Sequence, residues 1–198
     1  MKKRMAALML TMAMAAAPVS AYAADASQTL SVAVTAEVKT LVQWAASEEQ
    51  ASLVNNQAQE GLFRMDENNQ PQPALCDTYD VSDDKLTYTF HLRDAKWTNG
   101  DKVTANDFVY SWRKIIKDAG NYAYMLGNGG ASVKNADALM ELGANATDEQ
   151  MATLGVTAKD DKTLVVELEN KVPYFTDLMA FPCYFPQNEK FVEKCGKN

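Results

Sequence analysis

Two stretches of this chain share one design, and they constrain the fold more than any other feature. Each has a short apolar segment, an acidic turn, and a segment in which apolar and polar residues alternate. The first covers residues 75–92 with its turn at 82–85, and the second covers 154–168 with its turn at 159–162. Strict alternation places one face of a strand against a core. We therefore predict two β-hairpins in one sheet.

The segment between the two hairpins predicts an amphipathic helix. Residues 97–101 contain an Asn-Gly turn, and Thr104 with Asp107 then forms a capping box. The apolar residues that follow recur at helical spacing: Phe108, Trp112, Ile115 and Ile116. The pattern ends near Gly120. With the hairpins, this helix gives a mixed α/β (α+β) fold.

Two further elements are predicted before the first hairpin. Residues 29–38 alternate as a strand, with one apolar face formed by Leu30, Val32 and Val34. Residues 47–50 form a second capping box, so Ser47 is expected to open a helix that stops at Gly61. The inward residues of that helix are expected to be Ala51, Val54 and Ala58.

Short helices are predicted over the later part of the chain. Residues 135–142 and 147–154 suit two helices joined by Gly143. Pro173 suits the first position of another helix, and a last helix is expected over residues 187–195. The inward residues of these last two helices are expected to be Phe175, Leu178, Met179, Phe191, Val192 and Cys195.

Residues 1–23 have the three parts of a secretory signal peptide. A basic start at residues 2–4 precedes an apolar run at 5–17, and small residues flank the tyrosine of the Ala-Tyr-Ala site at 21–23. The apolar run is too short to span a bilayer comfortably. We expect cleavage after Ala23 and an exported protein, periplasmic or at the cell surface, that is soluble once cleaved.

Charge and cysteine content narrow the possible partners. The chain has 26 acidic and 19 basic residues and a formal net charge of −7, which argues against binding to nucleic acid or to anionic membrane surfaces. Its three cysteines lack metal-type spacing. Either Cys183 pairs with Cys195 while Cys76 stays buried and free, or all three are small core residues.

No catalytic or metal-binding constellation is recognisable. His91 is the only histidine, and it lies on the outward face of a predicted strand. Nucleophile-elbow, zinc-protease and phosphate-loop motifs do not occur. The acidic pairs at 83–84 and 160–161 lack the further oxygens of a calcium loop and suit turns. We expect no enzyme, cofactor or metal.

A longer pattern resembles a known family. Residues 88–112 have the sequence YTFHLRDAKWTNGDKVTANDFVYSW. This stretch is similar to the signature of the family 5 extracellular solute-binding proteins, the oligopeptide- and dipeptide-binding receptors of ABC importers. An E-G-L step at 60–62 and the sequence V-P-Y-F at 172–175 extend the resemblance. The signature residues, for which we expect structural roles, are Arg93, Trp97, Gly100 and Asp107.

The resemblance implies a fold like that of periplasmic binding proteins of the large two-lobed class. Residues 24–60 would begin the first lobe, 61–170 would form a small extra mixed α/β domain, and 171–198 would return to the first lobe, with the second lobe missing. It implies a monomer that captures oligopeptides for ATP-driven import by ABC permease subunits.

The resemblance also supplies candidate ligand contacts. Ser47, Glu48 and Glu49 match a place where the first lobe of the family touches its ligand, and Tyr122 matches an aromatic position at the cleft edge. Charges at a helix start explain Glu48 and Glu49 equally well. Tyr122 would offer the ligand a flat, amphipathic contact.

Other functions stay open on the sequence alone. A member of the same family can take another ligand, such as a dipeptide, a nickel complex or an oligosaccharide. The chain can also be a truncated product without a transport role, either an interaction module or a nonfunctional remnant. An exported hydrolase is a further alternative, against which the single strand histidine argues.

Overall fold

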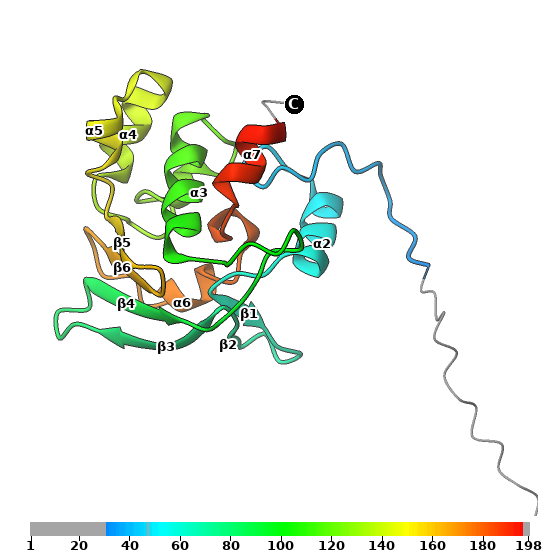
Figure 1. The fold of residues 1–198 in the computed structure, drawn as a ribbon, viewed down its shortest axis with the longest axis horizontal. Helices are drawn as coiled ribbons and strands as arrows, with labels where there is room; N and C mark the ends of the chain where they lie inside the picture. The colour runs from blue at the N-terminus through cyan, green and yellow to red at the C-terminus, as the bar shows by residue number, and fades with distance from the viewer. Residues whose placement is uncertain (1–30, 47, 196–198) are drawn as a thin grey trace, which may run out of the picture. The chain divides into compact units, whose positions relative to one another are not determined.

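The computed structural model describes residues 31–46 and 48–195 (Figure 1). The predicted signal peptide lies outside these residues. From Thr35 onward the chain forms one compact unit, to which the description below applies. Within the described part, no helix is both long and apolar enough to cross a bilayer.

A four-stranded antiparallel sheet with the order β3-β4-β6-β5 lies at the centre of the fold. Its strands are β3 (Cys76–Val81), β4 (Thr87–Leu92), β5 (Val156–Asp160) and β6 (Thr163–Glu167). The two predicted hairpins are confirmed as parts of one sheet. Phe90 lies opposite Leu164, and Tyr88 lies opposite Val166, and all four side chains are buried. The alternation therefore predicted the correct face.

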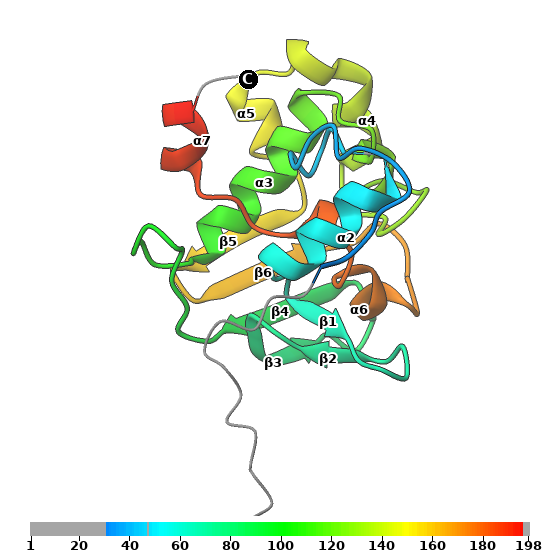
Figure 2. The same ribbon diagram turned by 90° about the vertical axis from the view of Figure 1, so that its right-hand side faces the viewer.

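Helix α3 (Ala105–Lys117) packs over the buried face of this sheet (Figures 1 and 2). The Asp107 carboxylate accepts a hydrogen bond from the backbone N–H of Thr104 at 2.7 Å, which confirms the capping box. The predicted stripe is fully buried: Phe108, Trp112, Ile115 and Ile116. The helix ends three residues before Gly120, close to the predicted end.

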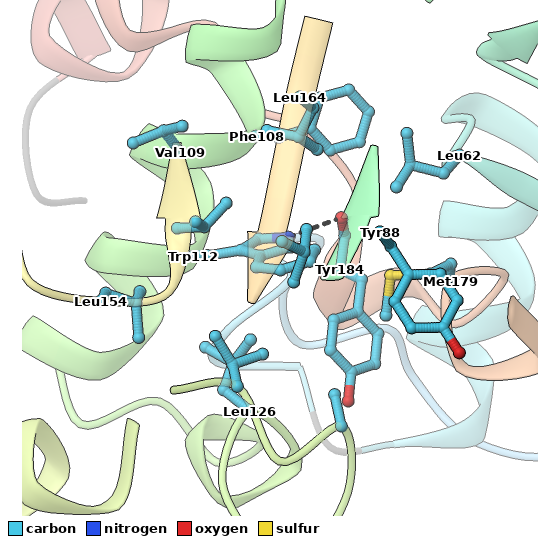
Figure 3. Packing of buried hydrophobic residues seen from close by; sticks show 14 of the residues in the cluster. Leu62, Tyr88, Phe108, Val109, Trp112, Leu126, Leu154, Leu164, Met179 and Tyr184 are labelled. Carbon is cyan, nitrogen blue, oxygen red and sulfur yellow. Dashed lines mark hydrogen bonds between the residues drawn. The ribbon is translucent and has the colours of Figure 1, made fainter. Parts of the chain in front are cut away.

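A segment from much later in the chain closes the core against α3. The indole N–H of Trp112 donates to the carbonyl of Tyr184 at 2.9 Å, and the hydroxyl of Ser111 donates to the carbonyl of Phe185 at 2.7 Å. Figure 3 shows the first of these bonds among the buried apolar side chains. Both carbonyls therefore have a hydrogen-bond partner inside the core, as buried polar groups require.

The remaining elements are short. They are α2 (Glu49–Ala58), β1 (Phe63–Met65), β2 (Pro71–Pro73), η1 (Ala123–Met125), α4 (Ala136–Leu142), η2 (Gly143–Asn145), α5 (Asp148–Met151), α6 (Phe175–Leu178), η3 (Pro182–Tyr184) and α7 (Glu189–Cys195). Gly143 has a φ of 51° and turns the chain after α4, as its predicted joining role requires. Pro173 precedes α6 by two residues instead of opening it.

Predictions for the N-terminal part are corrected. Residues 31–38 form no strand, because no described strand supplies hydrogen-bond partners for them. Helix α2 begins one residue later than predicted, with Glu48 at the N-cap, while Ser47 lies outside the described residues. Its buried residues are Ala51 and Asn55, and the predicted inward residue Ala58 is exposed.

Predictions for the C-terminal part are corrected in a similar way. No residue of α7 is buried, and Phe191, expected to face inward, is 56% exposed. Helical spacing identified the apolar residues of α7, but it could not supply a surface to cover them. Cys183 is buried, Cys195 is exposed, and both are free, so the predicted pairing is wrong. The alternative, that all three cysteines are core residues, holds for Cys76 and Cys183 and fails for Cys195.

Candidate ligand-contact site

Tyr122 lies directly before η1 in a group of aromatic side chains. Its ring centre is 5.2 Å from that of Phe181 in an edge-on arrangement, and 6.4 Å from that of Tyr124. Tyr122 is half-buried, whereas Tyr124 is 53% exposed. Edge-on ring contacts are favourable and hold the rings in place. We call Tyr122, Tyr124 and Phe181 the aromatic surface.

The core supports the backbone beneath this surface. The hydroxyl of Tyr184 and the backbone N–H of Ala131 both donate to the carbonyl of Met125. Burial raises the pKa of the Tyr184 hydroxyl, so that the group stays protonated and remains a donor. The turn that carries the aromatic surface is therefore tied directly to the most buried tyrosine of the fold.

A polar network holds the glycine-rich turn that follows. The backbone N–H of Asn128 donates to the Asp137 carboxylate at 3.2 Å, and the Asn128 side-chain amide donates to the same oxygen. The side-chain amide oxygen of Asn128 accepts hydrogen bonds from the Ser132 hydroxyl and the Asn170 side-chain amide, each at 3.0 Å. A Cβ on Gly127 would lie 1.9 Å from a carboxylate oxygen of Asp137, so a larger residue here would displace that side chain from its bonds with Asn128.

Asn121 connects this loop to the segment that leads into α2. Its backbone N–H donates to the carbonyl of Trp44 at 2.8 Å, and its side-chain amide donates to the carbonyl of Ala45 at 2.9 Å. Tyr122 therefore lies one residue from a double contact with the segment that precedes Glu48. Sequence reasoning missed Asn121, whose only signal is its place beside Tyr122.

The acidic candidates lie at the start of α2. Glu48 is half-buried and pairs with Lys39 at 3.3 Å. Glu49 is exposed in the first helical turn, where the helix dipole favours a negative charge. The structure thus brings the chain segments of Tyr122 and Glu48 together through backbone carbonyls. Ser47 lies outside the described residues.

The signature residues have the structural roles predicted for them. Arg93 pairs with Glu60, the acid of the E-G-L step, at 3.1 Å. Gly100 has a φ of 93° in the Asn-Gly turn. The Asp107 carboxylate also accepts the indole N–H of Trp97 at 3.4 Å, and burial raises the pKa of Asp107 despite these bonds. These residues join the hairpin, the turn and α3.

A catalytic or metal centre would need titratable or metal-ligating side chains held close together. His91 lies on the outer face of β4, as predicted. Its Nε2 is 3.1 Å from a carboxylate oxygen of Asp80. Where the structure describes the chain, no group of three His, Cys, Asp or Glu side chains is placed to hold a metal.

Comparison with known proteins shows to which family the chain belongs. The model for bacterial extracellular solute-binding proteins, family 5 Middle, matches residues 70–197. The chain belongs to this family. Family 5 is a family of solute-binding receptors rather than of enzymes.

Relatives and solved structures of family 5 agree with this assignment. The chain is 41% identical over 147 residues to a dipeptide-binding protein of Lactococcus lactis subsp. cremoris, and 42% identical over 147 residues to the oligopeptide-binding protein OppA of Bacillus subtilis. Each match covers 73% of this chain and 25% of the relative, so the chain spans about a quarter of their length.

The fold is shared with a solved family 5 receptor, Haemophilus influenzae OppA in complex with the peptide RPPGFSPFR. The TM-score is 0.75 at 37% identity, and the match covers 82% of this chain and 31% of that one. The predicted fold class, mixed α/β of the periplasmic peptide-binding type, is confirmed.

Proposed function

We propose that the chain is part of an exported receptor that captures oligopeptides for ATP-driven import by an ABC transporter. The observation that carries this proposal is the likeness, over 82% of the chain, to a family 5 receptor solved with a bound peptide. Relatives named for oligopeptide and dipeptide binding support the same ligand class. Permease subunits would supply the pathway, and other partner subunits of the transporter would hydrolyse ATP.

The proposal includes the division into lobes. Residues 24–60 and 171–198 belong to the first lobe, and residues 61–170 form the small extra domain. The hydrogen bonds from Trp112 and Ser111 to carbonyls of residues 184 and 185 support a fixed arrangement of these parts. A signal peptide over residues 1–23 would deliver the monomeric protein to the periplasm or the cell surface.

The ligand would lie between the first lobe and a second lobe and be bound largely through its backbone, as an added strand is bound. Tyr122 would give the peptide a flat contact from the aromatic surface, and Ser47, Glu48 and Glu49 would face it from the start of α2. The support for this arrangement is that Asn121 joins the two segments that carry these residues.

A chimeric receptor tests the proposal. Residues 35–195 would replace the matching segment of Bacillus subtilis OppA, and calorimetry would measure peptide binding. We expect the folded chimera to bind peptide, and Tyr122→Ala to weaken binding about tenfold, whereas Tyr122→Phe keeps the ring and most of the affinity. A folded chimera without peptide affinity would contradict the function. Unchanged affinity in Tyr122→Ala would remove only this residue from the site.

The chain alone is expected to bind peptide weakly or not at all. One side of a cleft cannot desolvate a ligand from both sides, so the cost of immobilising the ligand is not recovered. Calorimetry on residues 24–198 that gave micromolar or tighter binding would contradict this expectation.

A dipeptide is the second candidate ligand, favoured by the relative named as a dipeptide-binding protein. The same chimera distinguishes the two ligands, because a dipeptide receptor should lose affinity as the peptide lengthens.

A further inference from the structure

A hollow of about 330 Å³ lies at the junction of the end of α2, β1 and the turn after β4. This volume is at the lower end of the range for small-ligand pockets. The residues that decide its chemistry are Glu60, Arg64, Leu75, Lys96, Trp97 and Val103. It shares no residue with the aromatic surface or with the start of α2.

The rim of the hollow is basic, although the chain carries 26 acidic and 19 basic residues. A single carboxylate, that of Glu60, is shared between Arg93 at 3.1 Å and Arg64 at 3.8 Å. Lys96 is exposed and takes part in none of the ion pairs between described residues. Two cations of the lining, Arg64 and Lys96, therefore face its one carboxylate, and Arg93 beside the hollow also pairs with that carboxylate, which leaves room for a second anion.

The floor of the hollow is apolar. Leu75 and Val103 are buried, and the half-buried Trp97 lines the hollow with them. The Trp97 N–H is directed to Asp107 at 3.4 Å, which fixes the edge of the ring. Guanidinium groups bind carboxylates through paired hydrogen bonds, and an indole packs favourably against another ring.

We infer that this hollow binds a small carboxylate attached to an apolar group about the size of a phenyl ring. Arg64 and Lys96 bind the carboxylate. Trp97, with Leu75 and Val103 beneath it, packs against the apolar group. The inference goes beyond peptide capture, and its outcome does not depend on that function, because the residues of the two sites are separate.

Binding is tested with two probes that differ only in charge, N-acetyl-L-phenylalanine and its neutral amide. The chain has three tryptophans, so the indole N–H signals of the ¹⁵N-labelled protein give few resonances to follow. We expect the acid to shift the Trp97 signal with a Kd on the order of 1 mM, and the amide to bind at least about fivefold more weakly. Trp112, bonded to Tyr184 inside the core, should not shift.

Variants assign the effect to the hollow. Arg64→Gln and Lys96→Gln should each weaken binding of the acid about three- to fivefold, the range expected for an exposed charge pair. Lys159→Gln removes the same charge from an exposed position on β5 and should leave binding unchanged. An unshifted Trp112 signal confirms that each variant is folded.

Three results would overturn the inference. They are no response of the Trp97 signal to the acid, an equal response to the amide, and a loss in Lys159→Gln as large as the losses in the rim variants. The peptide-binding assay on the chimera would be unaffected by any of them, so failure here is distinct from failure of the proposed function.

Discussion

Helices α3 and α7 have the same kind of sequence pattern, but only α3 buries its apolar residues. Both place apolar residues at helical spacing, and both were expected to bury them. Helix α3 buries its whole stripe, while no residue of α7 is buried and Phe191 is 56% exposed. An amphipathic pattern identifies a helix and its apolar face, but burial needs a second surface that the local sequence does not encode.

The two helices also differ in how they are anchored. Helix α3 has a capping box at its start and is bonded to the backbone of residues 184 and 185 from its middle. Helix α7 is anchored at its start by the side chain of Asn188. Its amide NH2 donates to the Asp101 carboxylate at 3.0 Å, and its amide oxygen accepts the backbone N–H of Phe191 at 2.9 Å. The stability of the fold should therefore depend on α3 far more than on α7.

The largest effect is expected from Trp112→Ala. The variant leaves a cavity beside the ring of Tyr184, whose centre is 5.6 Å from that of Trp112, and leaves the Tyr184 carbonyl without its donor. We expect a loss of about 3–5 kcal/mol in the free energy of unfolding, measured by urea denaturation. Trp112→Phe keeps much of the volume but not the N–H, so it should lose less. Equal losses in the two variants would mean that the hydrogen bond, and not the packing, dominates.

The rates at which the cysteines are alkylated give a second comparison between α7 and the core. Cys195 is exposed on α7, whereas Cys76 and Cys183 are buried. Burial raises the pKa of Cys76 to about 11 and raises that of Cys183 as well, which lowers the fraction of reactive thiolate. In the native protein, iodoacetamide should modify Cys195 at least about 100-fold faster than the others, as followed by peptide mass. Comparable rates at Cys183 would mean that the core opens readily near η3.

Much of the fold was predictable because its signals are local. The alternation over residues 86–92 and 164–168 identified the correct buried faces, and the capping box at Thr104 and Asp107 identified the start of α3. The pairing of β4 with β6 is not local, since more than seventy residues separate their partners. The similar design of the two hairpins predicted that they share one sheet, but not which of their strands pair.

The candidate site was predictable only in part. Tyr122 and Glu48 came from the family resemblance, and their role in binding a ligand stays a prediction, although Asn121 joins their segments. The residue that joins those segments, Asn121, was missed because its two bonds go to backbone carbonyls, which leave no trace in side-chain identity. The predicted strand failed over residues 31–38 for a related reason, since alternation does not show whether the described residues supply a partner strand.

The cap of α3 should have an intermediate effect. Asp107→Ala removes the acceptor for the backbone N–H of Thr104 and should cost about 1 kcal/mol of unfolding free energy. Burial raises the pKa of Asp107, so the folded state disfavours its charge. Asp107→Asn keeps an oxygen acceptor without that charge and should lose less than the alanine variant in the same urea titration. A larger loss in the asparagine variant would show that the charge itself stabilises the helix start.

The smallest effect is expected from Phe191→Ala on α7. More than half of this side chain is already in contact with solvent, so its removal leaves no cavity, and the free energy of unfolding should change by no more than about 0.5 kcal/mol. Phe108→Ala is the matched control, because the same ring is removed from a fully buried position on α3 and about 3–5 kcal/mol should be lost. A loss above about 1 kcal/mol in Phe191→Ala would mean that this face of α7 is covered in solution, and the inward orientation predicted from helical spacing would then be correct.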